Sequence, residues 1–185
     1  MSHCAKEIGM STTLLSKIQP ELRSGDLLAW KTTKINSFFD FILFLYQKIF
    51  KAEFTHVAIV AIIGDRQFIV EATPPVVRLY PLSMTDDFYL IKTDLELNNR
   101  HYDRLLKNLG KPYSLWDFFK GIFGIGSTDD SYYCSELAGN FYNNIGYIVD
   151  DEAPHTPHAL VRAVLKKSEH EMIFVRNDRG NLNGI

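Results

Sequence analysis

Cysteine is scarce in this sequence, and its scarcity excludes two common ways of stabilising a small fold. The chain of 185 residues contains only two cysteines, Cys4 and Cys134. Two cysteines are too few for a disulfide framework or for a structural zinc site. We therefore expect no bound metal, no cofactor and a reducing compartment.

Concentrated positive charge and long apolar runs are also missing. The chain has 20 Lys and Arg against 22 Asp and Glu, for a formal net charge of −2, and no dense basic run. This balance argues against a nucleic-acid partner. No uninterrupted apolar segment at the N-terminus is typical of a signal peptide, and none reaches the roughly 20 residues of a membrane span. We therefore expect a cytoplasmic protein.

What remains is the composition of one globular domain with a substantial core. The apolar fraction is 46% and the charged fraction is 23%. We predict a single domain over residues 23–176, preceded by an N-terminal arm at 1–22 and followed by a flexible tail at 177–185. We find no internal repeat and no linker.

The middle of the chain carries the pattern of an antiparallel sheet. Residues 55–63 form a nearly continuous apolar, β-branched run, Gly64 and Asp65 mark a hairpin turn, and residues 66–72 return as a partner strand. Further short runs predict strands at 27–30, 76–82, 88–92 and 172–175. The predicted fold class is therefore α+β, with about four to six antiparallel strands packed against helices.

Helices are predicted between these strands. The expected ranges are 35–50, 95–109 with a stop at Gly110, 116–122, a helix beginning near Cys134, and 158–166. Residues 38–50 are apolar on nearly all sides, unlike a one-sided surface helix. This segment can be a helix buried in the core. It can also be a lid, or a patch that faces an acyl chain or a membrane surface.

One stretch, from Tyr132 to Tyr142, has features of a reactive site. Apolar residues recur behind Cys134 at helical spacing, so the cysteine lies in or near the first turn of a predicted helix. The residues available to cap this helix are Asp129, Asp130 and Ser131. A thiol near a helix start is favoured as thiolate by the positive end of the dipole. The alternative is a buried cysteine that acts as a small hydrophobe.

An imidazole and a carboxylate on the predicted hairpin can complete such a site. His56 begins the otherwise apolar run, and Glu71 lies on the returning strand. With a turn at residues 64–65, both side chains can share one face of the sheet. A buried carboxylate requires a partner. His56 can be a satisfied core residue, or it can accept a proton from Cys134 while Glu71 orients its ring.

Five short motifs occur in a characteristic order. They are Gly25-Asp26-Leu27-Leu28, Thr55 to Val60, Val70-Glu71-Ala72, Gly110 to Tyr113, and Tyr133 to Leu137. Together they resemble the circularly permuted NlpC-type papain-like cysteine hydrolases, and most of all the YiiX/YebB-like branch. In that group the histidine strand precedes the cysteine helix, the reverse of the order in papain. The resemblance extends to residues 156–160 and spans most of the chain.

The resemblance implies a papain-like fold with a catalytic cysteine at a helix N-terminus. By position, Cys134 is the nucleophile, His56 the base and Glu71 the orienting residue. Further candidates, for substrate binding or for an oxyanion site, are Tyr113, Tyr133 and Ser135. The backbone N–H of Cys134 is also a natural oxyanion donor. One departure is Ala58, because the family often has glycine there.

These residues predict a thiol-dependent hydrolase that cleaves an amide bond in a peptide, such as a cell-wall peptide, through an acyl-enzyme intermediate. The apolar segment 38–50 keeps a second interpretation open, an acyltransferase or esterase acting on lipids or other acyl groups. A third is a papain-like binding module without activity. The expected partner is thus a peptide or an acyl-containing substrate, with lipid or membrane contact through residues 38–50 in the second case.

Overall fold

The computed structural model describes residues 21–32, 44, 47–49, 51–114, 131–148 and 156–177. Most of the arm, most of segment 38–50, the helix expected at 116–122 and nearly all of the tail lie outside these residues. The domain boundaries therefore stay predictions. No helix within the described ranges is long and apolar enough to cross a membrane.

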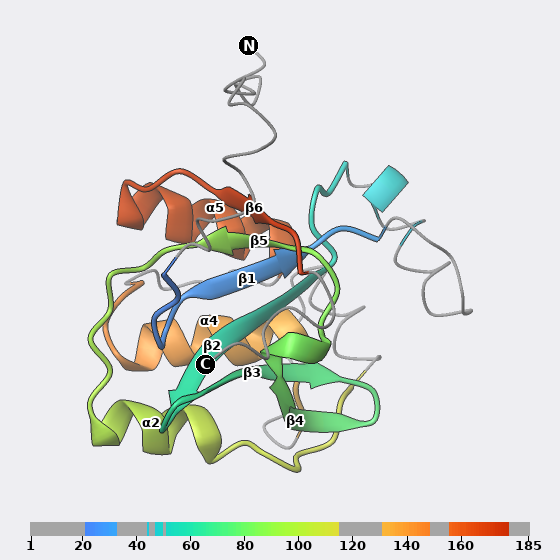
Figure 1. Cartoon of the computed structure of the whole chain (residues 1–185). Helices are drawn as coiled ribbons and strands as arrows, with labels where there is room; N and C mark the ends of the chain where they lie inside the picture. The colour runs from blue at the N-terminus through green and yellow to red at the C-terminus, as the bar shows by residue number, and fades with distance from the viewer. Residues whose placement is uncertain are drawn as a thin grey trace.

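Six antiparallel strands form one sheet, in the spatial order β4-β3-β2-β1-β5-β6 (Figure 1). The strands are β1 (Leu27–Trp30), β2 (His56–Ile63), β3 (Arg66–Thr73), β4 (Val76–Pro81), β5 (Phe88–Ile91) and β6 (Ile173–Val175). A short 3-10 helix, η1 (Leu82–Met84), follows β4. The predicted α+β class is confirmed, and each strand lies where its run of apolar or β-branched residues placed it.

The β2–β3 hairpin has the predicted two-residue turn. Ile63 pairs with Arg66, and the same register brings Ile59 opposite Val70. Side chains alternate between the two faces of a strand. In β2, Val57, Ile59 and Ala61 therefore join one core cluster, whereas Ala58 and Val60 join a second cluster on the other face.

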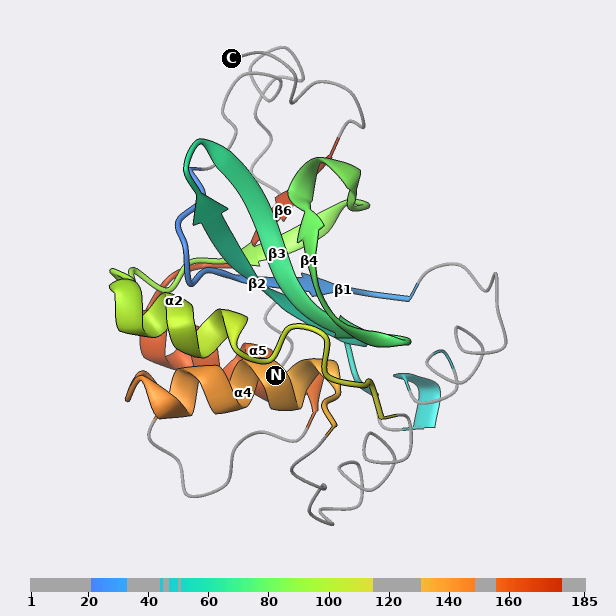
Figure 2. The same cartoon turned by 90° about the horizontal axis from the view of Figure 1, so that it is seen from below.

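Three helices lie on one side of the sheet (Figure 2). They are α2 (Asn99–Leu106), α4 (Cys134–Asn144) and α5 (Pro157–Ser168). Helix α4 packs against β2 and β3, and α5 packs against β1 and β5. The first core cluster fills this interface and includes Leu137 of α4 and Leu160 of α5. Burying one such leucine contributes about 1.5–3 kcal/mol.

The prediction for helix α2 was wrong at both ends. A helix over residues 95–109 was expected, but the observed helix covers Asn99–Leu106. The side chain of Asn98 caps its first turn and so sets the start of the helix. Leu95 and Leu97 lie in the irregular segment before the helix, and their apolar side chains pack against the core.

The turn that leads into β1 is tied to other parts of the fold. Asp26 is 1% exposed, and its carboxylate accepts hydrogen bonds from the backbone N–H groups of Arg23 at 2.8 Å and Thr93 at 3.0 Å. Burial raises the pKa of Asp26 above its ordinary value, and the two backbone bonds oppose that shift. The carbonyl of Gly25 accepts from the Tyr142 hydroxyl of α4 at 2.8 Å. The role of this turn is structural, since it joins β1 to the chain after β5 and to α4.

Gly25→Ala is expected to destabilise the protein by about 2 kcal/mol or more. The added methyl group would strain a backbone with positive φ, and it would also crowd a neighbouring side chain. Gly25 has a φ of +97°, and a Cβ there would lie 3.2 Å from Leu95 Cβ. Gly64→Ala is the matched control, because φ is +59° but no atom lies within 4 Å of the added Cβ. Urea unfolding followed by circular dichroism measures both variants. Equal losses at the two positions would contradict the close packing at Gly25.

Candidate active site

Cys134 is the first residue of helix α4. It is 3% exposed and follows Tyr133, which takes the N-cap position in an extended conformation without a side-chain capping bond. The expected cap by Ser131 is therefore wrong, and Asp129 and Asp130 lie outside the described residues. The sulfur of Cys134 lies 3.9 Å from the carbonyl oxygen of Thr55, the residue that precedes β2. The start of α4 is thus packed against the start of β2.

His56 is the first residue of β2 and lies next to this contact. Its Nε2 atom is 2.7 Å from Oε2 of Glu71, and its side chain also has hydrogen-bond and charge interactions with Cys134. When the hairpin register is continued, His56 falls opposite Thr73, two residues from Glu71 and on the same face. The structure therefore brings Cys134, His56 and Glu71 together.

The surroundings of the His56 imidazole favour its charged form. Burial by itself would lower the pKa of His56, because it penalises the imidazolium. Hydrogen bonds and charge attraction from Cys134 and Glu71 outweigh that penalty and raise the pKa of His56 to about 10. The surroundings of the ring therefore favour its imidazolium form.

Glu71 is a buried carboxylate with two cationic partners. It is 5% exposed. Its Oε1 atom accepts from Nε of Arg78 at 2.8 Å and pairs with Nη2 of the same guanidinium at 2.7 Å. Burial would raise the pKa of Glu71, but hydrogen bonds and charge from His56 and then from Arg78 lower it below its ordinary value. Glu71 is therefore an anion at neutral pH.

Arg78 was missed in the sequence, although a signal for it exists. The β3–β4 hairpin has a two-residue turn, Pro74-Pro75, which pairs Thr73 with Val76 and therefore Glu71 with Arg78. Reading Pro74-Pro75 as the loop of a tight hairpin, rather than only as a break between strands, would have placed Arg78 directly across from Glu71.

These side chains form a row across four adjacent strands. Trp30 of β1 pairs with His56 of β2, and Glu71 of β3 pairs with Arg78 of β4. The Trp30 and His56 rings are 5.4 Å apart between centroids and inclined at 41°. By strand alternation the row lies on the face of the second core cluster. His56 is the first residue of β2, so it lies at the end of that strand where Cys134 of α4 contacts Thr55.

The three additional candidates surround the cysteine in different ways. The backbone N–H of Tyr113 donates to the carbonyl of Pro75 at 2.9 Å, and the backbones of Tyr113 and Tyr132 form an isolated parallel β-bridge. Burial, followed by the charges of Cys134 and Tyr133, raises the pKa of Tyr113 well above its ordinary value. Its hydroxyl is therefore neutral. Tyr133 is 1% and Ser135 0% exposed, so these two side chains present almost no surface to a substrate.

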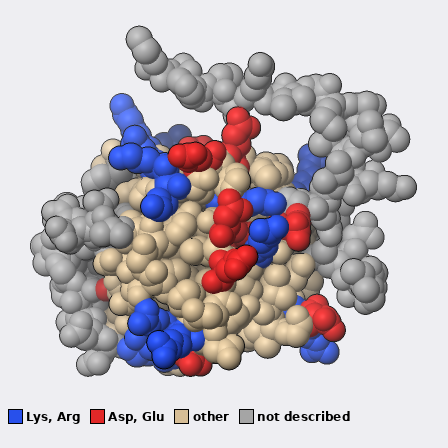
Figure 3. Space-filling model, turned by 90° about the vertical axis from the view of Figure 1, so that its left-hand side faces the viewer, with Lys and Arg blue, Asp and Glu red and all other residues tan. Residues whose placement is uncertain are grey.

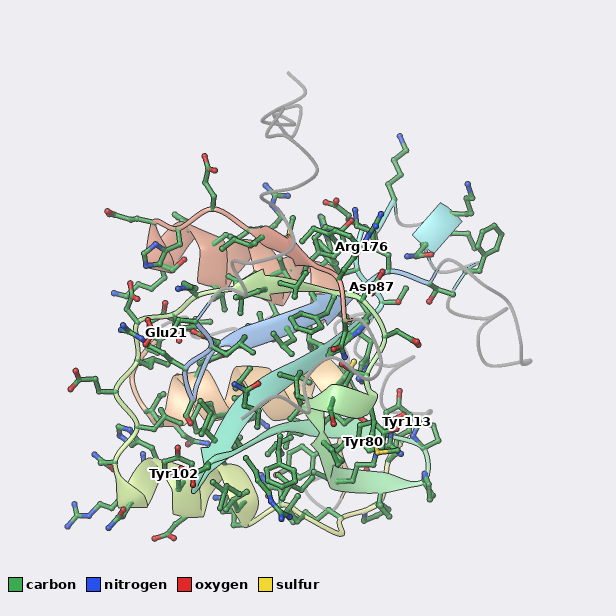
Figure 4. All side chains as sticks on the ribbon, in the orientation of Figure 1. Glu21, Tyr80, Asp87, Tyr102, Tyr113 and Arg176 are labelled. Atoms are coloured by element: carbon green, nitrogen blue, oxygen red, sulfur yellow. The ribbon has the colours of Figure 1, made fainter. Side chains whose placement is uncertain are left out.

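Figure 4 shows Tyr80 and Tyr113 at one end of the sheet and Tyr102 at the other. The side of the molecule shown in Figure 3 carries both acidic and basic side chains.

Another ion pair, between His170 and Asp94, has both side chains substantially exposed, at 39% and 55%. The hydrogen bond from His170 is the main reason that the pKa of Asp94 is lowered. This pair involves none of the residues around Cys134.

Comparison with known proteins supports the fold. No protein-family model matches the sequence, and no curated protein matches it. Among solved structures, the chain is similar to the crystal structure of the metalloprotein YiiX from Escherichia coli O157:H7, with a TM-score of 0.50 and 19% sequence identity. The alignment covers 85% of this chain and 91% of YiiX. The chain therefore has a YiiX-like fold, as the order of its motifs predicted, and at this identity the likeness concerns the fold alone.

The charged pairs of Glu71 are expected to stabilise the fold over a defined pH window. The folded pKa of His56 lies above its ordinary 6.5, and that of Glu71 lies below its ordinary 4.5. The stabilisation is therefore complete between about pH 4.5 and 6.5, decreases as pH rises toward 10, and is lost on acidification through the folded pKa of Glu71.

Glu71→Gln is expected to lower the free energy of unfolding by about 2 kcal/mol at pH 6, with a smaller loss at pH 10. It should also bring the pKa of His56 down toward 6.5, as followed by the NMR signals of the ring. A loss of stability that is the same at both pH values would contradict the charged pair.

Proposed function

We propose that this chain is a thiol-dependent hydrolase with a permuted papain-like arrangement, in which Cys134 is the nucleophile, His56 the proton carrier and Glu71 the orienting residue. One observation carries the proposal, namely that the His56 imidazole interacts with both Cys134 and Glu71. A nucleophile, a base and a residue that orients the base are the parts that such catalysis requires.

In this proposal each ring nitrogen of His56 has its own role. Nε2 is bonded to Glu71, so Nδ1 is the nitrogen that exchanges a proton with the sulfur. Transfer of the thiol proton to Nδ1 produces a thiolate and an imidazolium. The raised pKa of His56 favours that charged pair.

The reaction then proceeds in two acyl-transfer steps. The thiolate attacks the substrate carbonyl carbon, and the carbonyl electron pair moves onto oxygen. When the tetrahedral intermediate collapses, the imidazolium gives its proton to the leaving nitrogen and a thioester remains on Cys134. Water, deprotonated at Nδ1, attacks the thioester, and the carboxylic acid leaves as the thiol is restored.

The developing oxyanion would lie at the start of α4. Helix N–H groups point out of this end, and the helix dipole favours negative charge there. The backbone N–H of Cys134 is the proposed first donor. The neutral hydroxyl of Tyr113, whose pKa responds to the charge of Cys134, is a second candidate. Tyr133 and Ser135 would act through their position in the backbone rather than through exposed side chains.

The proposed substrate is a peptide amide. Acyl transfer from esters or lipids is a second candidate, favoured by the aromatic surface of Trp30 beside His56. The apolar segment that first suggested lipid contact lies mostly outside the described residues. YiiX is named a metalloprotein, but the residues described in this chain contain no group of three or more His, Cys, Asp or Glu side chains arranged to hold a metal. No step above involves a metal.

The proposal is tested by the reactivity of Cys134. In a Cys4→Ser background, where Cys134 is the remaining thiol, iodoacetamide is expected to alkylate the protein readily at pH 6. His56→Ala should slow alkylation at that pH at least tenfold, because the thiolate loses its imidazolium. The pH dependence of the rate, with the labelled peptide identified by mass spectrometry, provides the measurement.

Turnover is tested with peptide amides and with acyl esters and thioesters. Cys134→Ala and His56→Ala are each expected to reduce hydrolysis at least a thousandfold while circular dichroism stays unchanged. A mass increase on Cys134 identifies the acyl intermediate and the class of substrate. A fully active Cys134→Ala variant would rule out the mechanism. An alkylation rate of Cys134 that His56→Ala leaves unchanged would favour a binding module without activity.

A further inference from the structure

We propose that Arg78 is a positioning residue of this site, which binds one oxygen of Glu71 and thereby keeps the other oxygen directed at His56. The inference rests on the proposed function. It adds a fourth member, from a fourth structural element, to the set formed by Cys134, His56 and Glu71.

The two oxygens of Glu71 have separate partners. Arg78 uses both Nε and Nη2 on Oε1, at 2.8 and 2.7 Å, whereas Oε2 lies 2.7 Å from Nε2 of His56. A carboxylate held in this way cannot rotate without losing one of its charged hydrogen bonds. Such bonds are among the strongest that side chains form. The orientation of the His56 ring therefore depends on Arg78 through Glu71.

The sheet and an aromatic ring hold Arg78 itself in place. Arg78 is the direct cross-strand neighbour of Glu71. Its guanidinium carbon lies 4.3 Å from the centroid of the Tyr80 ring, which is two residues further along β4 and on the same face. A guanidinium over an aromatic face is attracted by the ring electrons. Arg78 thus keeps a defined position although 43% of its side chain is exposed.

The catalytic cycle gives Arg78 a task that His56 cannot perform. His56 is charged before attack and neutral after it has protonated the leaving group. While His56 is neutral, the 5% exposed carboxylate of Glu71 no longer has a positive charge on the ring beside it. A guanidinium does not titrate in this pH range. Arg78 therefore keeps Glu71 ionised, and ready to orient the ring, through the whole cycle.

The charged surroundings of Glu71 predict which side of a pH profile depends on Arg78. Among the described residues, the groups that face Glu71 are His56 from β2 and Arg78 from β4, with Cys134 of α4 beyond His56. Helix η1, which also packs against β3, contributes no charged side chain. Removing Arg78 should therefore make Glu71 take up a proton at higher pH. On acidification, the reactivity of Cys134 should then be lost at a higher pH than in the parent protein.

The experiment uses the full chain with Cys4→Ser and compares Arg78→Met, Arg78→Lys and Arg66→Met. Arg66 is the matched control, an exposed arginine at the far end of β3. Iodoacetamide alkylation of Cys134 is measured from pH 4 to 9. With Arg78→Met, the acidic limb of the profile is expected to move up by about one pH unit or more, so that alkylation at pH 5 falls about tenfold. In Arg78→Lys the acidic limb should stay close to its position in the parent protein, and in Arg66→Met it should be the same as in the parent.

A second measurement separates this inference from the proposed function. The NMR signals of the His56 ring report the protonation of Glu71 as a step on the acid side, without any need for a reactive thiol. If Cys134 is unreactive but the protonation step of Glu71 still moves in Arg78→Met, the proposed function is rejected and the positioning role of Arg78 is kept. If Cys134 is reactive but Arg78→Met changes neither the protonation step nor the acidic limb, the positioning role alone is rejected.

Should Arg78→Met fail to fold, Tyr80→Leu replaces it. This variant removes the ring beneath the guanidinium but leaves the Arg78 charge. A smaller shift of the acidic limb in the same direction is then expected, and an unchanged limb would overturn the inference.

Discussion

The carboxylate of Glu71 is the group on which the arrangement of this site depends. A buried carboxylate without cationic partners would be strongly destabilising or would take up a proton. Here it is 5% exposed and ion-paired with both His56 and Arg78. Its negative charge helps to keep the imidazole protonated, and its two oxygens define where the ring and the guanidinium lie. The position of the His56 ring depends on this contact, and its charge depends on this contact together with Cys134.

The fold provides the rigid frame for that contact. His56, Glu71 and Arg78 come from three neighbouring strands whose antiparallel register places them on one face. Helix α4 is held against β2 and β3, and its Tyr142 hydroxyl bonds to the turn before β1. The first residue of α4, Cys134, is therefore brought to the end of the sheet where His56 begins β2. Small shifts of either layer would separate the sulfur from the ring.

Likeness of fold and likeness of chemistry are separate matters for this chain. The similarity to YiiX extends over most of both chains at 19% identity, and a fold of this kind does not determine an activity. The proposal of thiol chemistry comes instead from particular side chains, their contacts and their charges.

Much of this architecture was determined locally and could be predicted. Gly64-Asp65 set the register of the β2–β3 hairpin, and this register placed His56 and Glu71 on one face, because strand side chains alternate. Hydrogen-bonding detail decided other points, such as the later start of α2 at the Asn98 cap. Only the tertiary structure could place Cys134 at the start of β2, where its sulfur contacts Thr55, 79 residues away in the chain. That contact depends on how α4 packs across the sheet, and packing between layers leaves no periodic signal in the order of the residues.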